Sequence, residues 1–331
     1  MAASRLTYAI EAGALNLPES GDIALFRPRA GFDISALDKK RIEIIQGNYP
    51  DYHSFEERGY RTAVTPNGNY SAAIVFLPRA KAHGRALIAQ ALAVSGGGPV
   101  AVDGLKTDGA DSILKECRKR GADIGEVVAK AHGKIFTLSG GDFSDWAADG
   151  NQQIDGGFLT SAGVFSADGV DKGSAALVWA LPEKMSGKIA DLGAGWGYLS
   201  HHVLERASVT ACHLVEAEYD ALQCARANIT DPRAHFHWDD AQTFNAETGF
   251  DHIVCNPPFH TGRAADPDLG RRFIQAAARL TARHGTLWLV ANRHLPYEQN
   301  LLAAFHEVSE VSGDASFKVF RAAKPQQKKR N

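Results

Sequence analysis

The stretch Asp191-Leu192-Gly193-Ala194-Gly195-Trp196-Gly197 decides the fold of this 331-residue chain. An apolar run from Lys188 to Leu192 leads into it, and Tyr198 to Arg206 is predicted as a helix. Glycines at a strand-to-helix turn let the backbone bend tightly and approach a ligand closely. The turn lacks the third glycine of a dinucleotide fingerprint, because position 198 is tyrosine. It also lacks the lysine of a phosphate-binding loop.

Strands and helices alternate through the rest of the C-terminal half. We predict strands at 209–215, up to Cys255 and at 286–291, and helices at 219–228, 271–283 and 294–305. A hairpin of residues 308–311 and 317–320 closes the chain. This alternation indicates an α/β fold with a mainly parallel sheet and helices on both faces. The hairpin adds an antiparallel closing strand.

The N-terminal half has a similar order of elements with different chemistry. A strand at 23–26 is followed by Arg27-Pro28-Arg29 instead of glycines, and a strand at 72–77 precedes a helix at 86–93 and a strand at 99–102. A degenerate copy of the C-terminal plan and an unrelated α/β domain both fit this order. Eight glycines between Leu138 and Gly173 predict a linker without helix. We therefore expect domains at 1–150 and 155–331.

Composition excludes several classes of protein. Hydrophobic residues make up 44% of the chain, so extensive disorder is excluded. The 36 basic and 38 acidic residues leave a net charge of −2, so a nucleic-acid partner needs a local basic face. The four cysteines have no C-x-x-C spacing, and neither a signal peptide nor an apolar run of membrane length is present. We expect a cytoplasmic monomer with free thiols, no metal site and no membrane contact.

Acidic residues stand at the next two predicted strand ends. Glu216 ends the strand after the glycine turn, where a carboxylate can bind ribose hydroxyls. Asp239 and Asp240 follow at the tip of the third strand, and we favour Asp240 as acceptor for an adenine amino group. The G-x-G-x-G pattern with Asp191 two positions before it resembles motif I of the class I S-adenosylmethionine-dependent methyltransferases.

A second motif, Asn256-Pro257-Pro258-Phe259, follows the apolar strand end at Cys255. Two prolines cannot extend a central strand, so they fix a rigid turn at the carboxyl edge of the sheet, where active sites lie. The side-chain oxygen of Asn256 and the carbonyl of Pro257 can accept hydrogen bonds from an exocyclic amine, and Phe259 offers a face for base stacking. Together with the glycine motif, this tetrapeptide resembles motif IV of amino-group N-methyltransferases.

Residues 160–323 resemble the RsmC-like family of small-subunit ribosomal RNA guanine-N2 methyltransferases. The stretches at 163–174, 290–297 and 317–322 carry the resemblance beyond the generic motifs. It implies methyl transfer from S-adenosylmethionine to the N2 amine of a guanosine, with assembled small subunits as substrate. It also implies a degenerate methyltransferase-like N-terminal domain that supports RNA recognition. By position, the cofactor contacts would come from Phe165, Ser174, Asp191, Gly193, Gly195, Glu216, Asp239, Asp240 and Asn256. Trp196 departs from the small residue usual in this family.

Two alternatives remain open. The same motifs serve N-methyltransferases that act on another nucleic-acid base or on a protein glutamine, and a noncatalytic RNA-binding assembly factor could keep the fold. Basic clusters that could meet RNA phosphates lie at 79–85, 118–120, 271–272 and 324–330. Each cluster is also explained as a solvated helix face or chain end.

Overall fold

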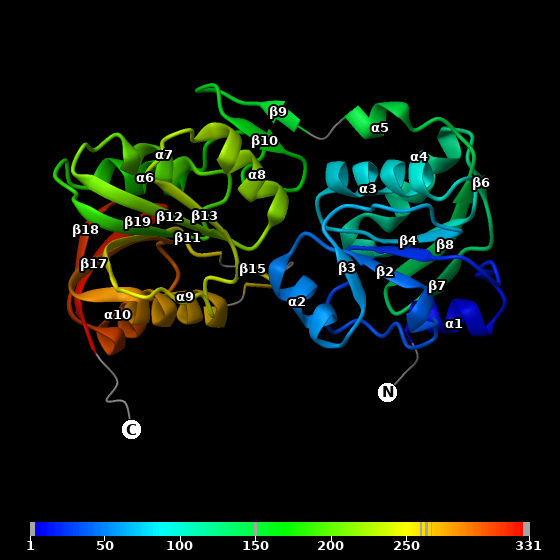
Figure 1. Cartoon of the computed structure of the whole chain (residues 1–331), viewed down its shortest axis with the longest axis horizontal. Helices are drawn as coiled ribbons and strands as arrows, with labels where there is room; N and C mark the ends of the chain where they lie inside the picture. The colour runs from blue at the N-terminus through cyan, green and yellow to red at the C-terminus, as the bar shows by residue number, and fades with distance from the viewer. Residues whose placement is uncertain (1–3, 149–150, 259, 262–263, 266, 327–331) are drawn as a thin grey trace. The chain divides into compact units, whose positions relative to one another are not determined.

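The computed structural model describes residues 4–148, 151–258, 260–261, 264–265 and 267–326. The chain divides into two compact units, Met1–Gln152 with Ser161–Gly163, and Gln153–Thr160 with Val164–Asn331. Each unit is built on one large sheet with helices on both faces (Figure 1). The four cysteines are buried free thiols. Within the described residues, no helix is both long enough and apolar enough to cross a bilayer.

The C-terminal unit holds a seven-stranded sheet in the order β13-β12-β11-β14-β17-β19-β18. The first five strands in this order are parallel, and β19 runs antiparallel to both of its neighbours. The fold class is therefore the predicted one. The strands are β11 (Gly187–Leu192), β12 (Val209–Glu216), β13 (Ala234–Trp238), β14 (Phe250–Cys255), β17 (Thr281–Asn292), β18 (Phe305–Gly313) and β19 (Phe317–Pro325).

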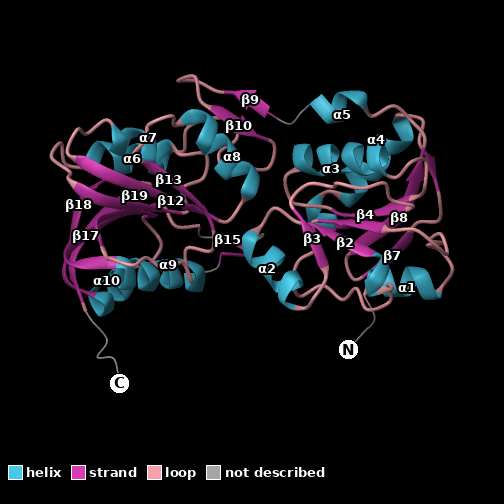
Figure 2. Cartoon of the chain, viewed as in Figure 1, coloured by secondary structure: helices cyan, strands magenta, loops and turns pink. Residues whose placement is uncertain are grey.

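Helices cover both faces of this sheet (Figure 2). One apolar cluster joins the sheet to α6, α7 and α8, and a second joins the opposite face to α9 and α10. Val203 and Ile274, which lie on opposite faces, are both fully buried. The helices are α6 (Lys172–Ala180), α7 (Tyr198–Leu204), α8 (Tyr219–Asn228), α9 (Pro267–Leu280) and α10 (Glu298–Ala304).

The N-terminal unit holds a sheet in the order β3-β2-β1-β4-β5-β8-β6, with β7 paired to β8. Its strands are β1 (Ile23–Phe26), β2 (Ile42–Ile45), β3 (Arg61–Ala63), β4 (Ala72–Phe76), β5 (Val100–Leu105), β6 (Asp123–Ile124), β7 (Val128–Lys130) and β8 (Gly133–Ser139). Its helices are α1 (Arg5–Glu11), α2 (Tyr49–Glu57), α3 (Lys81–Val94), α4 (Ala110–Lys119) and α5 (Ser144–Ala148), with short 3-10 turns at Lys39–Arg41 and Lys106–Asp108.

The two large sheets follow one plan. Position by position, β3-β2-β1-β4-β5-β8-β6 matches β13-β12-β11-β14-β17-β19-β18, and each corresponding pair of strands has the same parallel or antiparallel sense. This agreement favours a degenerate copy over an unrelated α/β domain. Two small hairpins lie outside the sheets, β9 (Asn151–Gln153) with β10 (Leu159–Ser161), and β15 (His260–Thr261) with β16 (Ala264–Ala265).

Two secondary-structure predictions were wrong. The glycine-rich linker contains the short helix α5, because Asp142 accepts a hydrogen bond from the Ser144 N–H and Trp146 is buried in the core. The helix predicted to reach Arg283 ends at Leu280. Thr281 already belongs to β17 and pairs with Phe250, so a backbone partner on the sheet overrides the helical periodicity.

Candidate active site

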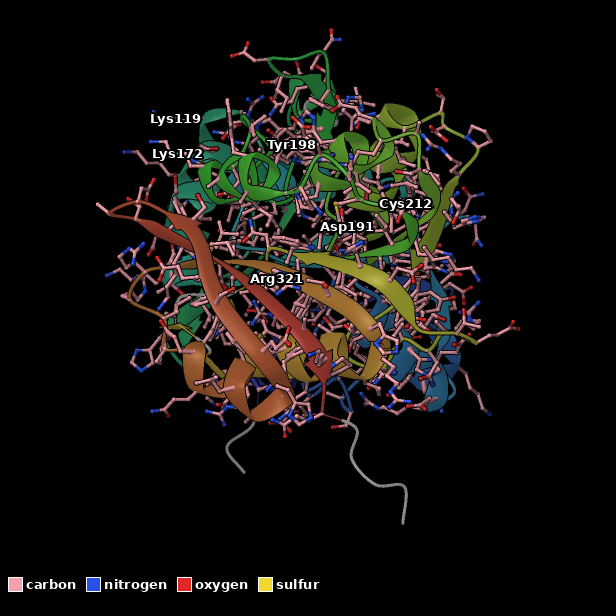
Figure 3. All side chains as sticks on the ribbon, turned by 90° about the vertical axis from the view of Figure 1, so that its left-hand side faces the viewer. Lys119, Lys172, Asp191, Tyr198, Cys212 and Arg321 are labelled. Atoms are coloured by element: carbon pink, nitrogen blue, oxygen red, sulfur yellow. The ribbon has the colours of Figure 1, made fainter. Side chains whose placement is uncertain are left out.

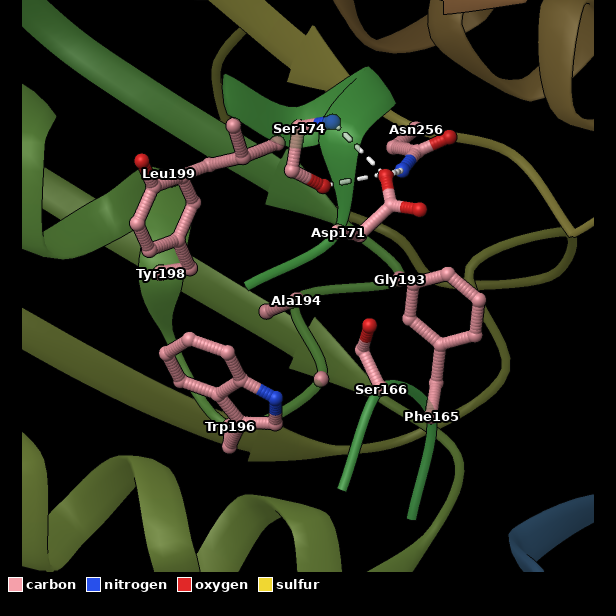
Figure 4. Close-up of a pocket in the computed structure, with 11 residues that line it drawn as sticks. Phe165, Ser166, Asp171, Ser174, Gly193, Ala194, Trp196, Tyr198, Leu199 and Asn256 are labelled. Carbon is pink, nitrogen blue, oxygen red and sulfur yellow. Dashed lines mark hydrogen bonds between the residues drawn. The ribbon is translucent and has the colours of Figure 1, made fainter. Parts of the chain in front are cut away.

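A pocket lies at the carboxyl ends of β11 and β14, where the glycine turn faces the start of α6 (Figure 4). It encloses about 380 Å³, including its open mouth. Five of the predicted site residues line it, and so do six residues that the sequence did not single out as ligands. The lining comprises Phe165, Ser166, Asp171, Ser174, Gly193, Ala194, Gly195, Trp196, Tyr198, Leu199 and Asn256.

The glycine turn needs glycine at three places for two different reasons. Gly193, Gly195 and Gly197 have φ angles of +76°, +55° and +93°, which other residues rarely adopt. A Cβ on Gly197 would also come within 2.8 Å of Ile229. A Cβ on Gly195 would meet nothing within 4 Å, so the space above this residue is open to a ligand.

Asp191, labelled inside the C-terminal unit in Figure 3, is not among the residues that line the pocket. Its carboxyl is fully buried, and its Oδ2 accepts hydrogen bonds from the backbone N–H and the hydroxyl of Ser200, at 3.1 and 2.7 Å. The other oxygen, Oδ1, is buried and has no hydrogen-bond partner among the described residues. Burial raises the pKa of Asp191 to about 7. In the structure, Asp191 therefore ties β11 to α7.

Glu216, at the end of β12, touches the glycine turn directly. Its Oε2 accepts the Gly195 N–H at 2.7 Å, and its Oε1 accepts the Glu218 N–H at 2.8 Å. Removal from water raises the pKa of Glu216 to about 7, and the two backbone hydrogen bonds oppose that shift. Both carboxylate oxygens therefore accept backbone hydrogen bonds, and Glu216 is not among the residues that line the pocket, so its contact with a ribose stays a prediction.

Asp239 and Asp240 follow β13 as predicted, but their carboxyls bond differently. Asp240 accepts hydrogen bonds from the backbone N–H of Gln242 at 2.9 Å and from its side-chain amide at 3.1 Å. Asp239 accepts the Asp240 N–H at 2.7 Å. The Asp240 carboxyl is therefore part of a local turn, and an adenine amino group would have to share it.

Asn256 is the polar side chain that β14 delivers to the pocket. Its Nδ2 donates to Asp171 Oδ2 at 2.9 Å and to Ser174 Oγ at 2.8 Å (Figure 4). Because both amide protons are engaged, this hydrogen-bond network orients the amide and leaves Oδ1 for an incoming group. Pro257 is buried and Pro258 is exposed. Phe259 lies outside the described residues.

The rim of the pocket includes Phe165, whose side chain is 57% exposed. Its neighbour Ser166 has a φ angle of +55°, a strained conformation for a residue with a side chain. Ser166, Ala194, Tyr198 and Leu199 carried no sequence signal for ligand contact. Asp171 carried none either, although an aspartate just before a helix is typical of an N-cap, which is its place at the start of α6.

Trp196 is buried at 3% exposure and packs on Phe158, with ring centroids 5.0 Å apart. Asn228 secures this side of the turn, because its Nδ2 donates to the Trp196 carbonyl at 2.9 Å. The same amide exchanges two hydrogen bonds with the backbone of Leu159. The unusual tryptophan therefore supports the turn by packing while it also lines the pocket.

Intramolecular contacts engage several of the predicted basic clusters. Lys81 and Arg85 both pair with Glu116, and Arg120 pairs with Asp145. Residues 327–330 of the basic tail lie outside the described residues. Within the described part of the chain, no group of three or more His, Cys, Asp or Glu side chains is placed to hold a metal ion.

Relatives with curated names cover different shares of the chain. The ribosomal RNA small subunit methyltransferase C of Alteromonas mediterranea is 28% identical over 309 residues, which span 89% of this chain and 83% of that protein. The enzyme of the same name from Salmonella typhimurium is 33% identical over 60% of this chain and 58% of its own length. The ribosomal RNA large subunit methyltransferase G of Alcanivorax borkumensis is 34% identical over 50% of this chain and 43% of its own.

Both units have a counterpart in one solved structure. The T. thermophilus 16S rRNA N2 methyltransferase (RsmC), solved with AdoMet and guanosine, matches with a TM-score of 0.80 at 24% identity and covers 98% of this chain and 92% of its own. The family model described as the methyltransferase small domain matches residues 155–321, about half of the sequence. The chain therefore belongs to the methyltransferase small domain family.

Proposed function

We propose that the chain transfers a methyl group from S-adenosylmethionine to the exocyclic N2 amine of a guanosine in small-subunit ribosomal RNA. The observation that carries this proposal is the orientation of Asn256. Both of its amide protons bond within the protein, so Oδ1 is the amide atom that can accept a hydrogen bond from an amine. The small-subunit methyltransferase C from A. mediterranea, which aligns with 89% of the chain, supports the choice of RNA.

The pocket fits the proposed cofactor. The open space above Gly195 leaves room for a ligand against the glycine turn, and Glu216 already bonds the backbone of that turn. We assign Gly193 and Gly195 to close backbone approach, Glu216 to the ribose, and Asp239 or Asp240 to the adenine amino group. Phe165 and Ser174 line the same pocket and would close over the cofactor. Asp191 would act through the turn that it anchors. When bound, the cofactor supplies a methyl group already activated by a positive sulfonium.

The chain's own residues then have to orient the acceptor. Asn256 Oδ1 and the Pro257 carbonyl each accept one hydrogen bond from the amine, which turns the nitrogen lone pair toward the methyl group. Phe259 would stack on the base. No strong base is required, because the amine can lose its proton during or after the transfer.

We assign methylation to the C-terminal unit, 155–331, and RNA recognition or support without cofactor binding to the N-terminal unit, 1–150. The basic clusters at 79–85, 118–120, 271–272 and 324–330 would meet RNA phosphates. We further propose that the protein acts as a cytoplasmic monomer on the assembled small subunit. Sedimentation of the purified protein, alone and with small subunits, tests the monomer and the partner together.

Methyl transfer from labelled S-adenosylmethionine tests the function. Unmodified small subunits, naked small-subunit RNA and large subunits are offered in parallel, and the labelled nucleotide is mapped. We expect label at guanosine N2 in the small subunit alone. Label in the large subunit would keep the chemistry and replace the substrate, a result that the relative from A. borkumensis makes worth testing. Bound cofactor without label in any RNA would contradict an RNA substrate and direct the search to proteins.

A further inference from the structure

Asp171 joins the acceptor side of the pocket to the start of α6. Its Oδ2 accepts two hydrogen bonds, from the Asn256 side-chain amide at 2.9 Å and from the Ser174 backbone N–H at 2.7 Å. The second contact makes Asp171 the N-cap of α6. The same carboxylate oxygen therefore caps a helix and holds the amide of Asn256.

The helix makes Asp171 a firm support. α6 packs its Leu177 into the core at 0% exposure, and the Asp171 backbone carbonyl accepts the Ala175 N–H at 2.9 Å. A residue fixed by both its backbone and its side chain loses little further entropy when it positions another group. Ser174 Oγ completes the arrangement by accepting from the same Asn256 Nδ2.

A carboxylate at this place does more than orient. Without a carboxylate on its nitrogen side, the amide could rotate by half a turn and present Nδ2, a donor, to the amine. A charged acceptor also draws on the amide protons and increases the electron density on Oδ1, which strengthens Oδ1 as an acceptor. Both effects favour the atom that has to bind the amine.

We propose that Asp171 is a positioning residue for methyl transfer, which fixes and polarises the Asn256 amide so that Oδ1 faces the acceptor amine. This inference rests on the proposed function, in which Asn256 binds that amine. In this inference, Asp171 acts through Asn256 and is assigned no contact with the methyl group or the amine. Its loss should therefore lower kcat and leave the affinity for S-adenosylmethionine nearly unchanged.

Two substitutions separate position from charge. Asp171→Ser keeps an N-cap hydroxyl for Ser174 but cannot reach Asn256, and we expect kcat to fall by about 10- to 100-fold. Asp171→Asn keeps the reach and removes the charge, so its loss should be smaller, about tenfold or less. Asp142→Ser replaces the aspartate that bonds Ser144 at the start of α5, in the other unit, and should leave kcat unchanged.

A double-mutant cycle with Asn256→Ala distinguishes positioning from a general loss of structure. If Asp171 acts through Asn256, Asp171→Ser has no further effect on kcat in the Asn256→Ala background, within about twofold. An equal loss of kcat in both backgrounds would overturn the inference, and so would a parallel loss of affinity for S-adenosylmethionine.

A second readout needs no RNA substrate. In protein labelled with ¹⁵N-asparagine, the Asn256 side-chain signal is assigned by its absence in Asn256→Ala. We expect its amide protons to exchange with water at least about tenfold faster in Asp171→Ser than in the wild type. Unchanged exchange would refute the role of Asp171 even if the wild type methylates small subunits. Faster exchange would support that role even if wild-type transfer fails and the proposed substrate is wrong.

Discussion

The N-terminal and C-terminal sheets place different residues at the same positions. Phe26 pairs with Ile45 as Leu192 pairs with Val215, so Gln46 occupies in the first sheet the position that Glu216 occupies in the second. Gln46 Oε1 accepts the N–H of the residue two positions later at 2.9 Å, just as Glu216 does at 2.8 Å. The N-terminal unit therefore keeps the hydrogen bond to the backbone two residues later, but it has a neutral amide where the C-terminal unit has a carboxyl group.

The same register places apolar and basic residues at the other positions that we propose for ligand contact. Phe76, the last residue of β4, occupies the position that Asn256 occupies just after β14, and it packs edge-on against Phe32 with ring centroids 4.7 Å apart. Arg27 stands in place of Gly193 and still has a positive φ of 60°. The helix that follows the glycine turn is replaced by an irregular segment with one 3-10 turn. A single scaffold is thus stable with or without ligand chemistry at its strand ends, because its cores lie on the sheet faces.

The largest expected difference between the units concerns Asn256 and Phe76. Asn256→Ala should lower methyl transfer by about 10²- to 10³-fold, because the amine loses its side-chain acceptor, with cofactor affinity nearly unchanged. Phe76→Ala should instead lower the free energy of unfolding by about 3–5 kcal/mol and leave transfer per folded molecule unchanged. Single-turnover assays and urea titrations measure the two effects. Equal losses of cofactor binding and transfer in Asn256→Ala would indicate misfolding.

Glu216→Gln gives the C-terminal unit the residue type that its counterpart, Gln46, has in the N-terminal unit. At pH 8, above the raised pKa of Glu216 of about 7, we expect the affinity for S-adenosylmethionine to fall by about 10- to 100-fold, since a charged acceptor becomes a neutral amide. Calorimetric titration of the cofactor measures the change. Gln46→Glu is the matched control and should neither create a second cofactor site nor alter the first. A stoichiometry of two in that variant would show that the N-terminal unit has kept more than its backbone.

The counterpart of Asp191 in the N-terminal sheet is the apolar Leu25. We therefore expect a buried carboxyl to make the stability of the C-terminal unit depend on pH, with no equivalent group at this position of the N-terminal unit. Burial raises the folded-state pKa of Asp191 to about 7, from an ordinary value of 3.8. The folded state therefore holds its proton more tightly, so the stability that it contributes is full below pH 3.8 and is lost as the pH rises through 7. Asp191→Asn keeps an acceptor for Ser200 and removes the charge. Between pH 5 and 8, we expect the free energy of unfolding to fall by about 2–3 kcal/mol less in this variant than in the wild type.

Urea unfolding across that pH range, monitored in both proteins, tests this prediction. The stability that Asp191→Asn gains at high pH is limited, because its amide nitrogen would take the place of Oδ1. That oxygen is buried and has no hydrogen-bond partner among the described residues, so the amide protons would be left without one. Parallel pH profiles for the variant and the wild type would show that Asp191 does not titrate with folding.

The smallest expected effect concerns backbone strain at Arg27. Arg27→Gly removes an unfavourable positive φ but adds chain entropy to the unfolded state, so we expect a gain of about 1 kcal/mol or less. Gly193→Ala, at φ +76°, should cost about 1 kcal/mol and also weaken cofactor binding. Thermal unfolding with and without cofactor separates the two consequences. A loss of cofactor affinity in Arg27→Gly would contradict the assignment of the binding site to the C-terminal unit.

The order of elements and the two motifs were predictable because they depend on local pattern. Apolar strands that end in glycines or prolines indicate both the sheet and its active edge, and the structure places Gly193, Gly195 and Asn256 on one pocket. The residues that join this pocket from other elements were harder to predict. Asp171 lies 85 residues before Asn256, and only the packing of α6 brings their side chains together.

The sequence predicted acidic residues at the strand ends but not which groups their carboxyls bond, and the structure supplies those hydrogen-bond partners. Asp191 and Glu216 both carry the expected charge type, but one is bonded beneath the turn to Ser200 and the other to the turn itself. Likewise, the sequence favoured Asp240 over Asp239, while the structure bonds Asp240 to Gln242. The hydrogen-bond partners of a carboxyl group determine which of its oxygens is available to a ligand. Such partners follow no repeating pattern of apolar and polar residues, so the sequence does not reveal them.

The hydrogen bonds between Asn228 and Leu159 determine where the C-terminal unit can be cut from the chain. The segment Gln153–Thr160 belongs to this unit, although Ser161–Gly163 belong to the other. The Asn228 side chain donates hydrogen bonds to the carbonyls of Leu159 and Trp196. Leu159, the first residue of β10, is therefore linked through Asn228 to the glycine turn. An expression fragment that begins at Val164 would lack this support. A fragment of the methyltransferase unit has to begin at or before Gln153, and proteolysis between 153 and 164 should loosen the glycine turn before it affects the sheet.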